Sequence, residues 1–375
     1  MFKIKKTPKI VKRNLDVEHI MLASCYYGYH GLGIENKEKI FSMLMTTDVH
    51  GCARQFNSAI EYLNYYDAID MGICLGDIQP ADFKQPNDWY VKLVKKSKKP
   101  FLSVLGNHDI GNSAKLSISA TPKMAVERYY APNLDKIGIE SLQEPYYLKL
   151  VDKYKIAILV LNCYDVPDDK VENGDYAVHR GYETFSQKQI DFIIKSLNEI
   201  PSDYHLMITM HNFPYLVNIV DCKWSQSKGQ RDCGKNSTYD GDIIPDIINA
   251  WINGGKLKEE YKPRCEGVLK PLIADCDFSK RGEGVFVGYF VGHVHFDNVA
   301  TSVKYENQNV IFYPSTALDL WQNHFCDMPR TLNTKAEDNI TVTSIHTEKR
   351  EIRLVRIGSN FTLNMQERLS FKINY

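Results

Sequence analysis

The chain has 375 residues, a length that allows one large domain or two domains of ordinary size. Its 46 basic and 46 acidic residues cancel, so no overall positive field favours nucleic acid as a partner. No apolar stretch reaches the roughly 18 residues that a membrane helix needs. We therefore expect a cytoplasmic protein that forms a single domain over residues 1–375, with no membrane partner and no strong nucleic-acid signal.

Short apolar strands alternate with helical patterns from residue 40 onward, after a leader of 38 residues that looks irregular. Apolar residues in helical phase predict helices over Ala53–Tyr66 and Ser186–Glu199, and Ser186 with Gln189 fits a capping box. Buried strands are predicted at Ile40–Thr47, Asp70–Leu75, Phe101–Leu105, Lys155–Asn162, Tyr204–Met210, Val285–Val291 and Val310–Tyr313.

The order of these elements predicts an α/β protein with mixed sheets. We expect a catalytic core over about residues 40–320 and antiparallel C-terminal strands over about residues 340–375. Residues 216–284 interrupt the alternation and are rich in Lys, Asp, Gly and Cys. This segment is predicted to be an insertion that lies beside or over the site.

Five short motifs follow five of the predicted strands. Open α/β sheets bind ligands beyond the carboxyl ends of their strands, so these motifs can converge on one point. They are Asp48-Val49-His50-Gly51, Gly76-Asp77, Gly106-Asn107-His108-Asp109, Met210-His211-Asn212 and Gly292-His293-Val294-His295.

The motifs bring together oxygen and imidazole donors without a thiolate, a set that suits Mn²⁺, Fe or Zn²⁺. Alternate residues of an extended segment face the same way, so Asp48 with His50, and His293 with His295, can each offer two ligands. The glycines leave room for close backbone approach. A single H-x-H or GD motif would mean little, but five in this order indicate a metal centre.

This ordered set resembles the calcineurin-like metallophosphoesterases over roughly residues 40–300. The resemblance implies a four-layer α/β/β/α sandwich of two mixed β-sheets flanked by helices, and two divalent metal ions. It assigns Asp48, His50 and His295 to the first ion, Asp77 to both, and Asn107, His211 and His293 to the second. His108 would be the catalytic acid, with Asp109 orienting its ring.

The chain departs from the protein phosphatase branch, where an arginine in a GD-x-x-D-R-G pattern binds phosphate. Here the sequence is Gly76-Asp77-Ile78-Gln79-Pro80-Ala81-Asp82, without that arginine. The resemblance therefore implies a hydrolase of a small-molecule phosphate ester, with a phosphodiesterase slightly favoured over a phosphomonoesterase or a nucleotide hydrolase. A non-catalytic scaffold on the same fold is the alternative from another class, and it would be expected to have lost ligands.

Weaker candidates lie between the motifs. Asn162, Tyr164 and Asp165 end a strand and either reach the site or form a plain turn. His179 and Arg180 either contact phosphate, which arginine binds through two parallel hydrogen bonds, or belong to a surface loop.

Overall fold

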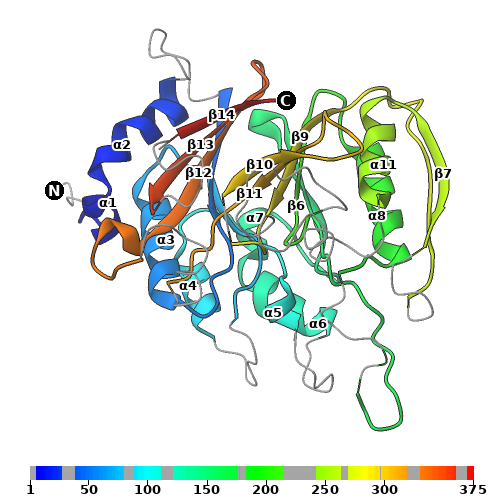
Figure 1. Cartoon of the computed structure of the whole chain (residues 1–375), viewed down its shortest axis with the longest axis horizontal. Coiled ribbons are helices and arrows are strands. Elements are labelled where there is room, and N and C mark those ends of the chain that lie inside the picture. Colours follow the sequence, from blue (N-terminus) through cyan, green and yellow to red (C-terminus); the bar gives the residue numbers. More distant parts are fainter. Residues whose placement is uncertain are drawn as a thin grey trace.

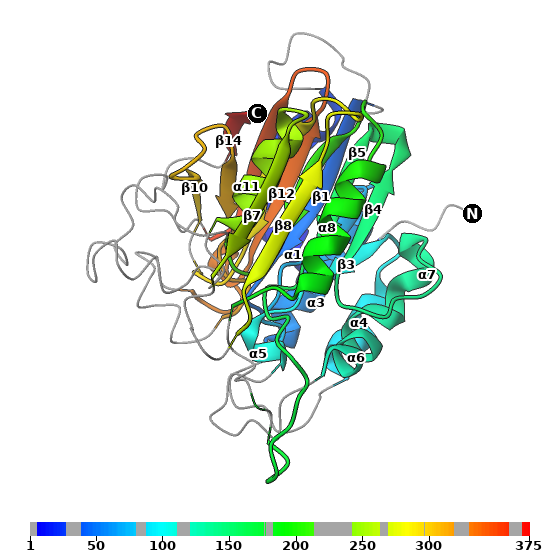
Figure 2. The same ribbon diagram turned by 90° about the vertical axis from the view of Figure 1, so that its right-hand side faces the viewer.

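Two six-stranded sheets face each other and carry helices on their outer surfaces (Figure 1, Figure 2). The computed structural model describes residues 6–27, 39–79, 88–110, 121–175, 177, 183–213, 242–262, 269–295, 297–318, 330–359 and 370–375. Both sheets are mixed, so the expected α/β/β/α sandwich is confirmed.

The first sheet has the strand order β14-β13-β12-β1-β2-β3. Strands β1, β2 and β3 run parallel, and β12 joins β1 in antiparallel pairing. Every residue of β1 and β12 is buried, since helices cover one face of the sheet and the second sheet covers the other. The strands are β1 (Ile40–Thr46), β2 (Met71–Cys74), β3 (Phe101–Ser103), β12 (Asn339–His346), β13 (Glu351–Gly358) and β14 (Ser370–Asn374).

The second sheet has the order β10-β11-β9-β6-β5-β4, in which β5, β6, β9 and β11 run parallel. The sheets meet through aromatic and hydroxyl contacts, such as the 2.8 Å hydrogen bond between Tyr313 Oη and Thr343 Oγ1. The strands are β4 (Tyr147–Val151), β5 (Ile156–Val160), β6 (His205–Thr209), β9 (Val285–Val291), β10 (Asn298–Thr301) and β11 (Asn309–Phe312).

Helices α3 (Ala53–Tyr65) and α4 (Trp89–Lys96) lie on the first sheet, and α8 (Gln187–Glu199) lies on the second (Figure 1). Half of the predicted capping box is confirmed, because the Ser186 side chain accepts a hydrogen bond from the Gln189 backbone N–H at 3.1 Å. The shorter helices are α5 (Asn107–Ile110), α6 (Pro122–Ala125) and α7 (Leu134–Ile137).

The expectation of an irregular leader is wrong for the described residues 6–27. They form α1 (Lys9–Arg13), α2 (Leu15–Leu22) and a π-helical turn (Ala23–Tyr27). The segment folds although its hydrophobic pattern is short, because its apolar side chains join the core. These side chains are Ile10, Val11, Val17, Met21 and Cys25.

Part of the predicted insertion belongs to the outer layer of the second sheet. Helix α11 (Ile243–Ile252) contacts β9, and the hairpin of β7 (Lys256–Tyr261) and β8 (Leu272–Asp277) contacts α8 and α11. Trp251 of α11 is fully buried and donates a hydrogen bond from Nε1 to the Leu197 carbonyl oxygen at 3.0 Å. Residues 214–241 and 263–268 of this region lie outside the described residues.

None of the helices in the described residues is long and apolar enough to cross a bilayer.

Arg13 ties the N-terminal helices to the core. Its guanidinium donates to both carboxylate oxygens of buried Asp338, at 2.8–3.0 Å, and lies 3.5 Å from a carboxylate oxygen of buried Glu337. Arg13→Ala would leave Asp338 buried without its cation, so we expect the free energy of unfolding to fall by about 3 kcal/mol. Urea unfolding measures it. Exposed Lys12→Ala serves as the control, and equal midpoints for the two variants would contradict the prediction.

Candidate metal centre

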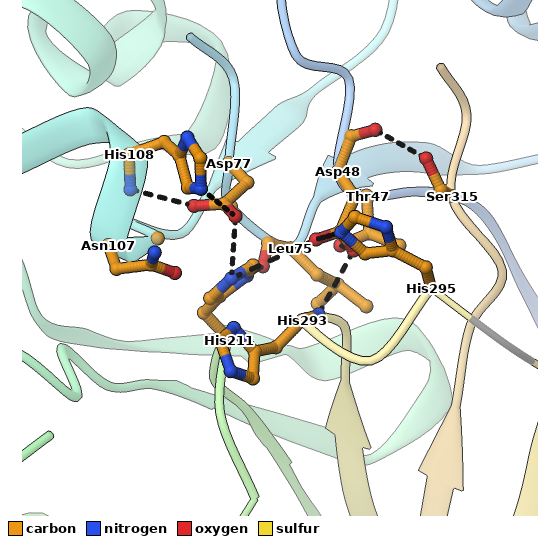
Figure 3. Close-up of polar contacts among 12 residues, drawn as sticks. Thr47, Asp48, Leu75, Asp77, Asn107, His108, His211, His293, His295 and Ser315 are labelled. Atoms are coloured by element: carbon orange, nitrogen blue, oxygen red, sulfur yellow. Dashed lines mark hydrogen bonds and ion pairs between the residues drawn. The ribbon is translucent and has the colours of Figure 1, made fainter. Parts of the chain in front are cut away.

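The five motifs meet at one edge of the sandwich, beyond the carboxyl ends of five parallel strands (Figure 3). Each motif follows its strand within four residues, so the short loops leave the side chains little freedom to diverge. The motif residues that follow β1, β2, β3, β6 and β9 are Asp48, Asp77, Asn107, His211 and His293.

Two groups of donor atoms form at this edge, with every donor atom of a group within 4.8 Å of the others. Asp77 belongs to both groups and therefore lies between them. The first group is Asp48, His50, Asp77 and His295, and the second is Asp77, His211 and His293. All six of these residues are among those singled out in the sequence.

The imidazole and carboxylate donor atoms of the two groups approach one another closely. His295 Nε2 lies 3.1 Å from Asp48 Oδ1, and His211 Nε2 lies 3.3 Å from Asp77 Oδ2. His50 Nε2 is 3.9 Å from a carboxylate oxygen of each aspartate and 3.1 Å from His295 Nε2. The donor atoms thus point toward common centres (Figure 3).

Several of these buried atoms have no hydrogen-bond partner, namely Asp48 Oδ1, His211 Nε2 and His293 Nδ1. A buried polar atom without a partner is costly, and cations between the donors would satisfy all three. The donor set therefore fits divalent metal ions.

The tautomer of His211 is set by its surroundings. Its Nδ1 lies 2.7 Å from the carbonyl oxygen of Leu75, which can only accept, so Nδ1 carries the proton. Nε2 of the neutral ring is then left with a lone pair that faces Asp77. Such a backbone partner orients a ligating histidine and raises its basicity.

The histidines differ in proton affinity. Burial lowers the pKa of His293 to about 3, which keeps that ring neutral and ready to ligate. Burial also opposes charge on His211, but the carboxylates of Asp77 and Asp48 outweigh it and raise the pKa to about 9. A metal ion bound beside Asp77 would replace the proton that His211 holds without it.

Backbone strain is concentrated at these ligands. Eight described residues other than glycine have a positive φ, and five of them carry donor atoms of the cluster. The left-handed region is unfavourable for such residues and persists where the surroundings enforce it. The five are Asp48 (φ 48°), His50 (φ 45°), Asp77 (φ 52°), His293 (φ 69°) and His295 (φ 62°).

Glycine is required where two of the loops touch. A Cβ on Gly106 would overlap the carboxylate and the backbone nitrogen of Asp77, and one on Gly292 would overlap Thr47 Oγ1. This confirms the expected role of the motif glycines in close approach.

Sequence reasoning missed two hydroxyl residues that hold Asp48. Thr47 Oγ1 donates to Asp48 Oδ2 at 2.7 Å, and Ser315 Oγ donates to the Asp48 carbonyl oxygen at 2.7 Å. Oδ2 also accepts from the backbone N–H of His293 at 3.0 Å, so only Oδ1 faces the cluster without a hydrogen bond (Figure 3). Thr47 stands next to Asp48 in the sequence, but nothing near Ser315 signals its contact.

The expected contact between Asp109 and the ring of His108 is wrong. Asp109 instead accepts hydrogen bonds from the backbone N–H groups of Ile78, Gln79 and Gly106 at 2.9–3.0 Å. Its carboxylate joins the loops after β2 and β3, and those three donors use both of its oxygens. Burial, and next the negative charge of Asp77, raise the pKa of Asp109 to about 7.

His108 lies against Asp77. Its backbone N–H donates to Asp77 Oδ1 at 2.9 Å, and its Nε2 is 3.7 Å from Asp77 Oδ2 (Figure 3). The side chain is 18% exposed, whereas His211 is fully buried. His108 is therefore partly accessible to an incoming substrate, as is His295, whose side chain is 23% exposed.

Tyr164 reaches the site, whereas its neighbours do not. Tyr164 Oη donates to Asn107 Oδ1 at 3.3 Å, and both side chains are buried. Asn162 Oδ1 instead accepts a hydrogen bond from the backbone N–H of Tyr164, and Asp165 Oδ2 accepts one from Gln189 Nε2, at the start of α8. His179 and Arg180 lie outside the described residues.

A family model described as calcineurin-like phosphoesterase matches residues 41–240, which is more than half of the chain. No curated protein sequence matches the chain.

Solved structures with similarity to the chain share about a tenth of its residues. The protein TT1561 of Thermus thermophilus has 10% identity and a TM-score of 0.42, over 84% of this chain and 99% of that one. Phosphopantetheinyl hydrolase from Mycobacterium tuberculosis has 10% identity and a TM-score of 0.38, over 75% and 90%. The 5'-nucleotidase precursor from Thermus thermophilus has 10% identity and a TM-score of 0.36, over 82% and 51%.

We predict that Gly106→Ala weakens metal binding by about 10- to 100-fold, because the added Cβ displaces the carboxylate of Asp77. Metal titration of the chelator-stripped protein measures this change. Gly255→Ala is the matched control, since its Cβ would meet nothing closer than 3.6 Å. Equal affinity in the two variants would show that Asp77 does not depend on this close approach.

Proposed function

Because this chain belongs to the calcineurin-like phosphoesterase family, we propose that it hydrolyses a small-molecule phosphodiester at two divalent metal ions. The observation that carries this proposal is the position of Asp77, whose carboxylate belongs to both donor groups at the carboxyl edge of the sheets.

The proposed ligands divide between the two ions. Asp48, His50 and His295 would hold one, His211, His293 and Asn107 would hold the other, and Asp77 would contact both. Two divalent ions so held would supply a nucleophile from water at neutral pH and neutralise the phosphate oxygens. Manganese, iron and zinc all suit these donors. Retention of every ligand type argues against a non-catalytic scaffold.

Asn107 is a neutral member of an otherwise charged or basic set. The buried Tyr164 hydroxyl directs a hydrogen bond at its Oδ1, the oxygen that an asparagine offers to a cation. This bond supports the assignment of Asn107 as a ligand, because it fixes the orientation of the amide in the manner of an outer-sphere partner.

His108 is proposed as the general acid that protonates the leaving oxygen. It is partly exposed beside the donor groups, and its Nε2 lies 3.7 Å from a carboxylate oxygen of Asp77. Because Asp109 accepts hydrogen bonds from backbone N–H groups, we propose that Asp77, and not Asp109, orients His108.

The charge of the site favours a diester over a monoester. Among the described residues, no lysine or arginine forms a hydrogen bond or ion pair with Asp48 or Asp77. A phosphate monoester carries nearly two negative charges at neutral pH, and a diester carries one. In the described part of the site, the positive charge beside these two carboxylates would thus come from the ions and the histidines, without a lysine or arginine partner, and we infer that this suits the monoanion better.

We predict that metal-stripped protein regains turnover with added Mn²⁺, and that bis-p-nitrophenyl phosphate is cleaved faster than p-nitrophenyl phosphate. Asp77→Asn should lower the rate by about 100-fold or more, since loss of outer-sphere partners alone costs up to about that factor. Exposed Asp203→Asn is the control and should match the parent. Absence of Mn²⁺-dependent turnover on both substrates would refute hydrolysis, and faster cleavage of the monoester would refute the diester assignment.

His108→Ala tests the general acid. We expect a loss of about 10²- to 10⁴-fold on a diester with a poor leaving group such as phenol, and a much smaller loss with p-nitrophenol, which needs no proton. Metal content should stay that of the parent. His205→Ala, outside the site, provides the control. Equal losses on both leaving groups would assign His108 to binding or metal retention instead.

A further inference from the structure

A concave region lies outside the metal centre, on the outer face of the first sheet. It is a groove of about 1020 Å³ between α1, α3 and α4, which lie next to one another (Figure 1). Eight basic and two acidic side chains line it. The chain as a whole is neutral, so positive charge has been gathered here locally.

Two of the basic residues are used within the fold. Arg13 and Arg54 pair with Glu337, and Arg13 also pairs with Asp338. The other acidic residue, Glu61, accepts a hydrogen bond from Asn57. Six lysines of the groove therefore face one remaining carboxylate, that of Glu61, with which none of them forms an ion pair in the described part of the chain.

Six lysines line the groove, all of them exposed, and none forms an ion pair with a described carboxylate. Lys92 and Lys96 stand four residues apart on α4, where like charges repel each other. A fold that collects such charges in a concavity gains stability when an anion enters it. The six are Lys6, Lys9, Lys12, Lys92, Lys96 and Lys98.

Aromatic rings accompany the charge. Tyr65 at the end of α3 and Trp89 at the start of α4 are half-buried and line the same groove. A positively charged groove with aromatic side chains along it is the arrangement that binds single-stranded nucleic acid, with phosphates on the cations and bases against the rings. A flat anionic membrane would not enter the concavity, and inorganic polyphosphate would make no use of the rings.

We propose that this groove, which we call the lysine groove, binds a single strand of nucleic acid. The strand would lie along α3, whose lining residues recur on one helical face from Ala53 to Tyr65, about 18 Å of helix at 1.5 Å per residue. Ala53 is three residues from His50, so one end of the groove begins beside the loop that carries a predicted metal ligand. Binding here needs no metal and is independent of the proposed hydrolysis.

The test is fluorescence anisotropy of the full chain with a labelled oligodeoxythymidine of about 12 nucleotides. EDTA in the buffer prevents any hydrolysis of the probe. We expect binding that weakens with salt, and Lys92→Glu with Lys96→Glu should weaken it at least tenfold. The slope of log affinity against log salt should fall by about 1.4 in magnitude, at about 0.7 for each lost contact to a single strand.

Lys95→Glu with Lys280→Glu is the matched control, because it makes the same charge change at exposed lysines that do not line the groove. The control should bind like the parent, and both double variants should retain the parental melting temperature. Equal weakening in both double variants, or no binding of the oligonucleotide by the parent, would overturn the proposal. Binding to phosphatidylserine vesicles that depends on Lys92 and Lys96, without oligonucleotide binding, would assign the groove to a membrane surface instead.

Discussion

The architecture depends on two carboxylates buried close together at the junction of the sheets. Asp48 is fully buried and Asp77 is 2% exposed. Burial raises the pKa of a carboxyl group, yet the surrounding histidines, His295 and His211 foremost, lower the pKa of Asp48 below its usual value. Removing two charges from water is tolerable only where opposite charge is supplied. The histidines that surround the two carboxylates, and the metal ions that these side chains fit, supply this opposite charge.

That constraint explains why the loops are strained. To aim a carboxylate or an imidazole at a shared centre directly after a buried strand, the chain must turn within two or three residues. Asp48, Asp77 and His293 do so in the left-handed region. The loops support one another, since the backbone N–H of His293 donates to Asp48 and that of His108 donates to Asp77. The side chains of Asp48 and Asp77 thus hold the backbone of the loops after β9 and β3.

The sequence was sufficient to predict which residues gather, because strand ends and donor types can be read from hydrophobic runs and local motifs. It could not reveal the contacts that depend on register between distant segments. Ser315 reaches Asp48 because it follows β11, which pairs with β9 in the second sheet, and the next residue, Thr316, hydrogen-bonds through its backbone N–H to the Thr47 carbonyl oxygen. The N-terminal helices were not predicted for a related reason. Their few apolar side chains become buried only through contacts with β13 and α3, which the local sequence pattern does not show.

Asp109 shows how a side chain next to a reactive residue can have a role that proximity in sequence does not predict. It turns away from His108 and holds the loops after β2 and β3 through three backbone N–H groups. His108 is left with Asp77 as its nearest carboxylate. Since Asp77 is also the carboxylate common to both donor groups, the proposed proton donor and the proposed metal ligands share one anion. A substitution of Asp77 would then disturb the proposed metal ligands and the position of His108 together, so the two cannot be changed independently through this residue.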